Sequence, residues 1–245
     1  MLPVDDRPHV RNSGIQASLA DNGDLAYVRA TNRTRLALLD RQGRALQTSD
    51  AEHNLIGPRI SPDGRLIVAN ELSDLTDRAD LWLFDRESGV LQRLTTDGNS
   101  FRPQWTPDGR GIVYLHRSQR GDEILLMPVG HSASSKVLIS AKAKDIRELV
   151  MGPDLRHAVV TINDWTSNVG AAHILGVDLG NHVPVSVQPL ETNLPGTQIR
   201  PAISPDGRWL AYESSESGRE EIYVRPFPEG GPPLQVTATA GLDPR

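Results

Sequence analysis

The chain has 245 residues, of which 38% are hydrophobic and only 4% aromatic, with 21 glycines, 18 prolines and no cysteine. Its formal net charge of −5 has the wrong sign for a nucleic-acid-binding domain, and no apolar run is long enough to span a membrane. The lack of cysteine excludes disulfide bonds and cysteine-ligated metal ions.

One short motif recurs along the chain and sets the order of the predicted elements. Ser61-Pro62-Asp63-Gly64-Arg65 returns at 106–110 and 204–208, with weaker copies at 20–24 and 152–156, spaced by roughly 40–50 residues. Proline presets φ, aspartate bonds nearby backbone N–H groups and glycine accepts a left-handed conformation, so each copy predicts a hairpin turn. The predicted turn residues are Asp21, Asp63, Asp108, Asp154 and Asp206, together with Gly23, Gly64, Gly109 and Gly207.

Each predicted turn lies between two short runs of β-branched, aliphatic or aromatic residues, which are typical of strands. A third run follows after a polar loop, and a short fourth run closes the unit. The third runs are 36–39, 81–84, 124–127, 173–177 and 222–224, and the fourth runs are Leu46, 90–91, 137–139, 185–187 and 234–236. Residues 141–150 could form a helical turn, but their place in the repeat predicts a first strand at 146–150. Four strands in a repeat of this period predict the blade of a β-propeller.

We therefore predict an all-β fold, with residues 1–245 forming a single β-propeller domain of four-stranded antiparallel blades. The five visible blades are placed at about 15–50, 53–97, 100–141, 145–191 and 198–238. Residues 1–8 and 239–245 are assigned to a further, incomplete blade, because Leu2-Pro3-Val4 resembles a closing strand and Asp243-Pro244-Arg245 resembles the approach to another turn. This interpretation makes the chain part of a ring of six or more blades, and a closed five-bladed ring is the alternative. Exposed blade edges would favour self-association.

Signals for catalysis and for metal binding are weak in this sequence. Residues 130–134 begin like a nucleophile elbow but lack its last glycine, and the seven histidines are scattered without metal-ligand spacing. Asp74, Asp77 and Asp80 alternate, but the glycine and the terminal glutamate of a calcium-binding loop are missing, so we interpret them as a solvated acidic loop. We expect no catalytic residue, no metal site and no cofactor.

The candidate binding residues lie on the predicted first strands, at five and at three residues before the turn proline. Strand alternation places these two positions on one face, which would look into the channel of a propeller. Arginines beside carboxylates at this channel mouth would bind a peptide terminus or a carboxylate group, and the alternative is that the charges neutralise one another. Trp165, in an irregular loop, is a further candidate contact. The predicted binding residues are Arg59, Arg102, Gln104, Glu148, Arg200, Asp243 and Trp165.

Several segments carry a resemblance to a known family. The turn motif, followed by 80–85 and by Leu94-Thr95, resembles the WD-like repeat of TolB-type propellers. Residues 200–212 and 222–228 are similar to the propellers that follow the kinase domain in many bacterial serine/threonine kinases. This resemblance covers essentially the whole chain.

The resemblance implies a non-catalytic sensor module that binds a protein or peptide partner or a ligand. The charge and the lack of a long apolar run predict no nucleic-acid binding and no membrane insertion by this chain. It also implies an extracytoplasmic location, either periplasmic or at the cell surface. The alternative is the substrate-gating propeller of a prolyl-oligopeptidase-like serine peptidase whose hydrolase domain is absent from this chain.

Overall fold

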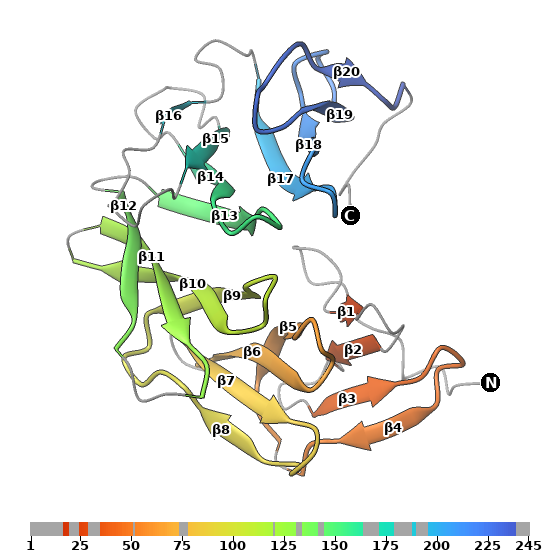
Figure 1. The fold of residues 1–245 in the computed structure, drawn as a ribbon, viewed down its shortest axis with the longest axis vertical. Coiled ribbons are helices and arrows are strands. Elements are labelled where there is room, and N and C mark those ends of the chain that lie inside the picture. Colours follow the sequence, from red (N-terminus) through yellow and green to blue (C-terminus); the bar gives the residue numbers. More distant parts are fainter. Residues whose placement is uncertain are drawn as a thin grey trace. The chain divides into compact units, whose positions relative to one another are not determined.

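A computed structural model provides the fold of the chain. It describes residues 17–19, 25–28, 35–50, 52–73, 78–119, 121–130, 134–141, 145–163, 172–178, 188–189 and 196–238. Within these ranges every regular element is a β-strand, and no helix could cross a membrane. The strands form five antiparallel sheets of four strands each, and every sheet uses consecutive strands of the chain (Figure 1). The predicted all-β fold of four-stranded blades is confirmed.

The strands of each blade follow one another along the sequence. The first blade contains β1 (Ala17–Leu19), β2 (Leu25–Val28), β3 (Leu36–Leu39) and β4 (Ala45–Thr48). The second contains β5 (Leu55–Ile60), β6 (Leu66–Leu72), β7 (Ala79–Asp85) and β8 (Leu91–Arg93). The third contains β9 (Ser100–Trp105), β10 (Gly111–Ser118), β11 (Gly121–Pro128) and β12 (Lys136–Ala141). The fourth contains β13 (Asp145–Met151), β14 (His157–Asn163), β15 (Ala172–Asp178) and β16 (Gln188–Pro189). The fifth contains β17 (Gln198–Ile203), β18 (Trp209–Ser214), β19 (Glu221–Pro226) and β20 (Leu234–Gln235).

The strand predictions hold in all five blades, with one shift. Residues 146–150 lie inside β13, so the repeat was a better guide there than the local helical tendency. The closing strand of the fourth blade is β16, just after the predicted run 185–187, which lies outside the described residues. The terminal segments 1–8 and 239–245 also lie outside them, and their assignment to a further blade stays a prediction.

The chain divides into two compact units, residues 1–114 and 115–245, and each is described by itself. In the first unit β1 contacts β5 and β5 contacts β9, and in the second β13 contacts β17, so the first strands of successive blades lie beside one another. Apolar side chains fill the space between neighbouring sheets. Leu36 and Leu38 of the first blade pack with Leu55, Ile67 and Phe84 of the second.

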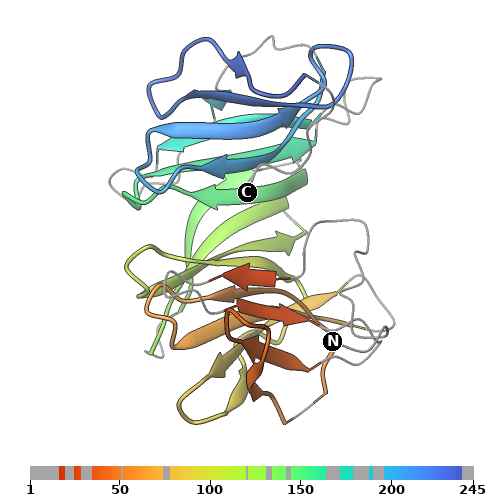
Figure 2. The ribbon, with the colours of Figure 1, turned by 90° about the vertical axis from the view of Figure 1, so that its right-hand side faces the viewer.

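The same packing joins the last two blades of the second unit. Val159 of the fourth blade packs with Leu210, Tyr212, Tyr223 and Phe227 of the fifth. Figure 2 shows the blue sheet of the fifth blade lying against the sheet of the fourth. The fifth blade therefore buries one sheet face against the fourth blade.

The hairpin turns have the predicted chemistry. The Ser61 hydroxyl donates to Asp63 Oδ1 at 2.5 Å and accepts the N–H of Leu66 at 2.8 Å, while Asp63 Oδ1 accepts the N–H of Arg65 at 3.0 Å. Gly64 has φ of +73°, a left-handed value that glycine adopts without steric cost. The copies at 106–110 and 204–208 make the same three contacts, which confirms the predicted turns around Asp108, Gly109, Asp206 and Gly207. Asp21 and Gly23 lie outside the described residues.

The turn of the fourth blade reaches the same shape with different residues. Leu155 takes the place of the glycine and has φ of +58°, and Gly152 takes the place of the serine. Without a hydroxyl at that place, Asp154 Oδ1 accepts the N–H groups of Arg156 at 3.0 Å and of His157 at 2.9 Å directly. The predicted turn role of Asp154 is confirmed.

Candidate functional site

Two arginines on first strands have left-handed backbones. Arg102 in β9 and Arg200 in β17 both have φ of +53°, and Gly57, at the same place in β5, has φ of +57°. The pairing of the first and second strands shifts register at this place in β5, between Ile56 and Arg59, and in β17. Such β-bulges re-aim a side chain. Because the left-handed conformation costs an L-residue about 1–2 kcal/mol, the surroundings must hold both arginines in place.

Asn70 of the preceding blade holds Arg102. The N–H of Arg102 donates to Asn70 Oδ1 at 2.8 Å, and Asn70 Nδ2 donates to the carbonyl oxygen of Ser100 at 3.0 Å. Asn70 lies in β6 and is only 5% exposed. One buried amide therefore binds two backbone groups of the next first strand, while the Arg102 side chain remains exposed.

Glu148 and Thr161 together take the place of this asparagine beside Arg200. The N–H of Arg200 donates to Glu148 Oε2 at 2.7 Å, and the same oxygen accepts the Thr161 hydroxyl at 3.3 Å. Thr161 and Asn70 both stand eight residues after the turn proline of their blade. Threonine has a shorter side chain than asparagine, and the Glu148 carboxylate spans the distance between the Thr161 hydroxyl and the N–H of Arg200.

A buried carboxylate orients the Arg200 guanidinium. Arg200 Nη1 lies 2.6 Å from Glu213 Oε2, and the Glu213 side chain is 1% exposed while that of Arg200 is 31% exposed. A buried carboxylate is costly unless a cation pairs with it, so this ion pair fixes the direction of the arginine side chain.

The other first-strand candidates follow the predicted alternation. In β9, Pro103 and Trp105 are buried, whereas Arg102 is exposed and Gln104 is half-buried. Arg59 is half-buried in β5, and its carbonyl oxygen accepts the indole N–H of Trp105 at 2.8 Å. Their binding role stays a prediction, and two further candidates, Trp165 and Asp243, lie outside the described residues.

Two residues that hold the arginines, Asn70 and Glu213, were not among the predicted site residues. The proposed neutralisation of Arg200 does occur, but its partner is Glu213, while Glu148 binds the backbone of Arg200 instead of its guanidinium. A signal was present in the sequence. Asn70, Thr161 and Glu213 are polar residues within apolar second strands, each eight residues after the turn proline.

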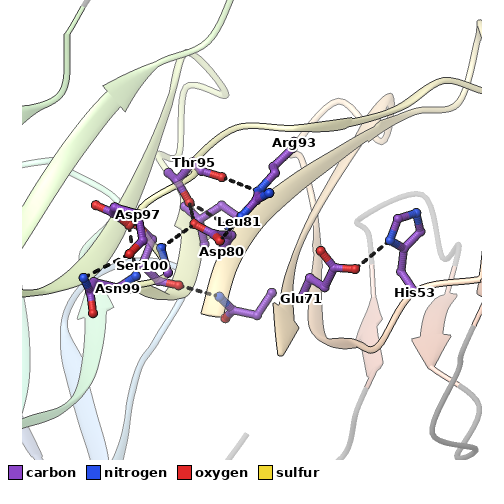
Figure 3. A network of polar contacts seen from close by, with 11 residues as sticks. His53, Glu71, Asp80, Leu81, Arg93, Thr95, Asp97, Asn99 and Ser100 are labelled. Atoms are coloured by element: carbon purple, nitrogen blue, oxygen red, sulfur yellow. Dashed lines mark hydrogen bonds and ion pairs between the residues drawn. The ribbon is translucent and has the colours of Figure 1, made fainter. Parts of the chain in front are cut away.

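Asp80 belongs to a second polar network, shown in Figure 3. It is 6% exposed, and its carboxylate accepts Arg93 Nη2 at 2.5 Å, the Thr95 hydroxyl at 2.9 Å and the N–H of Gly98 at 3.0 Å. The interpretation of Asp80 as part of a solvated loop is therefore wrong, because the carboxylate is buried and connects β7 to the segment after β8. Asp74 and Asp77 lie outside the described residues.

Glu221 is the equivalent buried carboxylate in the fifth blade, where it connects β19 to the segment after β20. It is completely buried, accepts the Thr237 hydroxyl at 2.6 Å and pairs with Arg219 Nε at 2.6 Å. Thr237 in turn accepts the N–H of Ile222 at 2.9 Å, as Thr95 accepts the N–H of Leu81. These acid–hydroxyl pairs fasten the third strand to the segment after the fourth, so we assign them a structural role.

A cleft of about 360 Å³ lies beside the Asp80 network in the first unit. Its charged walls are Glu71, Arg78, Asp80, Arg93 and Asp97. The carboxylates outnumber the guanidinium groups, so the cleft has no excess of positive charge for an anionic ligand. Over the described ranges, no three His, Cys, Asp or Glu side chains come together as a metal site.

Comparison with solved structures identifies the architecture. TolB from Acinetobacter baumannii superposes with a TM-score of 0.66 at 19% identity, over 86% of this chain and 51% of that one. The fold is a TolB-like β-propeller. Oligogalacturonate lyase from Vibrio parahaemolyticus superposes with a TM-score of 0.69 at 15% identity, over 93% of this chain and 68% of that one. A prolyl endopeptidase superposes with a TM-score of 0.62 at 15% identity, over 83% of this chain and 33% of that one.

These likenesses concern the fold. The chain spans about half the length of the TolB that it matches and a third of the prolyl endopeptidase. No protein-family model and no curated protein matches the sequence. The propellers it resembles belong to proteins with different names and activities, so function has to be argued from the site.

Proposed function

We propose that this chain is a non-catalytic binding module whose first-strand arginines bind carboxylate groups of a protein or peptide partner. The observation that carries the proposal is the left-handed backbone of Arg102 and Arg200. Glycine would adopt this conformation without strain, as it does at Gly57, yet two blades place a long cation there and hold it with side chains of the preceding blade. Backbone strain that the surroundings maintain is typical of functional positions.

The chemistry of the side chain indicates the partner. A guanidinium is planar, stays charged and matches a carboxylate with two parallel N–H···O bonds. Arg102 is exposed at the surface, and the buried Glu213 orients Arg200. An oriented guanidinium loses less side-chain entropy when it binds than one that moves freely.

The test selects peptides with free C-termini from a displayed library on the purified protein and titrates the selected peptide against its C-terminal amide. Arg102→Gly removes the side chain in the conformation that Gly57 already uses, so the fold is kept. We expect the carboxylate peptide to lose affinity at least about tenfold, which is about 1.4 kcal/mol. The matched control is Arg110→Ala, which removes an exposed arginine from a turn.

A second variant examines the fifth blade. Arg200→Gly combined with Glu213→Gln removes the cation without leaving its buried carboxylate charged, and we expect a similar loss of affinity. The proposal is wrong if the library yields no binder, if the amide binds as well as the carboxylate, or if Arg110→Ala weakens binding as much as Arg102→Gly.

A more specific proposal is that this chain is the propeller of a bacterial receptor-like serine/threonine kinase. It rests on the similarity of residues 200–212 and 222–228 to the propellers that follow kinase domains. A kinase domain and a membrane span encoded upstream of this chain would support it. The alternative is a gating propeller of a peptidase, to which the likeness to a prolyl endopeptidase gives some weight. A hydrolase domain with a nucleophile elbow encoded beside this chain would favour that alternative.

A further inference from the structure

The cleft beside the Asp80 network stands on the face of the second blade that packs against the first. Ile67, Ala69 and Phe84 on this face belong to the apolar cluster that joins the two blades. Glu71 lies two residues beyond Ala69 and pairs with Asp80 across β6 and β7, so strand alternation places both carboxylates on the same face. Regular strands therefore hold part of the charged wall of the cleft.

Two contacts fix the direction of the Arg93 guanidinium. Its Nε donates to the carbonyl oxygen of Thr95 at 2.8 Å, and its Nη2 donates to Asp80 Oδ2 at 2.5 Å (Figure 3). The Arg93 side chain is 44% exposed, whereas that of Asp80 is 9% exposed. A guanidinium has five N–H donors. Those on Nη1 have no partner among the described residues, so an oriented part of Arg93 remains for a ligand.

Arg78 supplies a second guanidinium, and its side chain lies across Gly98. Gly98 has φ of +70°, and a Cβ atom there would lie 3.0 Å from Cδ of Arg78 and 3.2 Å from its Cβ. Only glycine allows this conformation and this close approach without strain. Within the part of the chain that the structure describes, the Arg78 guanidinium has no ion-pair partner. Its charge is therefore available to a ligand in the cleft.

Glu71 supplies a carboxylate that is also held in place. Its Oε1 lies 2.7 Å from Nδ1 of His53, and its side chain is 27% exposed (Figure 3). The His53 ring packs in turn against the indole of Trp82, with 4.4 Å between the ring centroids. The other oxygen of Glu71 accepts no hydrogen bond from the described residues. It can therefore accept one from a ligand, and Asp97 lines the same cleft.

We propose that this cleft binds a small zwitterion, an α-amino acid or a dipeptide, independently of the first-strand arginines. Asp80 compensates the charge of Arg93, which leaves Arg78 for the ligand carboxylate and Glu71 for its ammonium group. Arg93 Nη1 adds a further donor to the carboxylate.

The size and the polarity of the cleft agree with such a ligand. Pockets for drug-sized ligands measure about 300–1,000 Å³ and are mostly apolar. This cleft of about 360 Å³ is at the small end of that range, and charged side chains form much of its wall. A ligand with one kind of charge would leave a group of the opposite preference desolvated and unpaired, which is costly.

Titration of the purified chain with alanine and with dialanine, followed by ¹H–¹⁵N NMR spectra, tests the proposal. Each zwitterion is compared with its N-acetyl form and with its C-terminal amide. We expect a zwitterion to shift the signals of the Gly98 N–H, which donates to Asp80, and of the Arg93 Nε–H, until the site is saturated. The two capped forms should bind at least about tenfold more weakly.

Two variants separate the two charges of the site. Arg78→Gln should weaken binding of the zwitterion at least about tenfold and remove its advantage over the amide. Glu71→Gln keeps a side-chain oxygen for His53 but loses the charge, so it should remove the advantage over the N-acetyl form. The matched control is Arg65→Gln, which changes an arginine of the same blade that is 56% exposed and lies outside the cleft.

Three results would overturn the proposal. Neither zwitterion shifts these signals up to about 20 mM, where even millimolar affinity gives saturation. The capped forms bind as well as the zwitterions. Arg65→Gln weakens binding as much as Arg78→Gln does. Binding that survives Arg78→Gln but is lost in Arg102→Gly would place the ligand at the first-strand arginines, which contradicts this proposal and leaves the proposed function standing.

Discussion

At the scale of single residues, left-handed backbone positions recur in the turns and bulges of this fold. Most are glycines, but Arg102, Leu155 and Arg200 are not. Asn70 holds the N–H of Arg102 and Glu148 holds that of Arg200, and both arginines belong to the binding site that we propose. Leu155 is 38% exposed at the tip of a turn, and no binding role follows from its position. Its strain is therefore a stability cost without an assigned function.

Leu155→Gly should stabilise the protein. Removing the left-handed strain of an L-residue stabilises the folded state by about 1–2 kcal/mol. Glycine is more flexible than leucine in the unfolded chain, which lowers this gain by about 0.4–1 kcal/mol. We expect a net gain of about 0.5 kcal/mol in the free energy of unfolding, measured by urea denaturation. Leu155→Ala keeps the strained conformation and is the control, so an equal gain from alanine would contradict this explanation.

The same turns make stability depend on acid pH. The hydroxyl of Ser204 and the guanidinium of Arg208 lower the pKa of Asp206 from 3.8 to about 2. Because the pKa is lower in the folded state than in the unfolded chain, the ionised Asp206 stabilises the fold above about pH 4. This contribution is lost as the pH falls through the folded pKa towards 2.

Asp206→Asn should therefore lower Tm at neutral pH, and the difference from wild type should shrink between pH 4 and pH 2. Thermal unfolding followed by circular dichroism at several pH values measures this. Glu229→Gln, which changes an exposed carboxylate outside the turns, is the control. A difference in Tm that stays constant down to pH 2 would show that the aspartate acts through packing and not through its charge.

At the scale of the elements, buried acid–hydroxyl pairs fasten the segment after the fourth strand to the third strand. The fourth strands of the second and fifth blades are short, with three residues in β8 and two in β20. Their few backbone hydrogen bonds leave them weakly held. Asp80 with Thr95 and Glu221 with Thr237 add side-chain contacts at the point where the chain leaves the blade.

Asp80→Ala should be strongly destabilising, by about 2–4 kcal/mol, because it leaves the Thr95 hydroxyl and the N–H of Gly98 without their acceptor and removes the partner of Arg93. Glu87→Ala removes an ion-pairing carboxylate that is 78% exposed and should change stability by less than about 0.5 kcal/mol. Urea denaturation of the two variants measures the contrast. Equal effects of the two substitutions would mean that burial of Asp80 has no energetic importance.

At the scale of the whole molecule, the proposed role requires no chemistry from this chain. We expect the purified protein to hydrolyse no peptide or ester and to transfer no phosphate, because its sequence carries neither a complete nucleophile elbow nor a glycine-rich phosphate-binding loop. Assays with fluorogenic peptide, ester and ATP substrates test this. Turnover that disappears when one of the chain's own side chains is replaced would contradict it, whereas turnover that survives every such replacement would come from a contaminant.

The sequence by itself determined the blades. Turn chemistry acts within five residues, as in Ser61 to Arg65, and the side-chain alternation of strands acts within a few more. These local preferences repeat with one period, so even β13, whose own residues suit a helical turn, was placed correctly. Local signals of this kind are independent of how distant segments pack.

Only the tertiary structure decided which side chains meet. Asn70 reaches Arg102, and Glu148 reaches Arg200, across from one blade to the next. Glu213, rather than Glu148, pairs with the Arg200 guanidinium, and Asp80 is buried although its sequence neighbours suggested a solvated loop. Such contacts join residues far apart in the sequence, and a buried polar group binds whichever donor or acceptor the packing brings within about 3 Å. No local pattern encodes that distance, so the partners of the site residues followed from the fold alone.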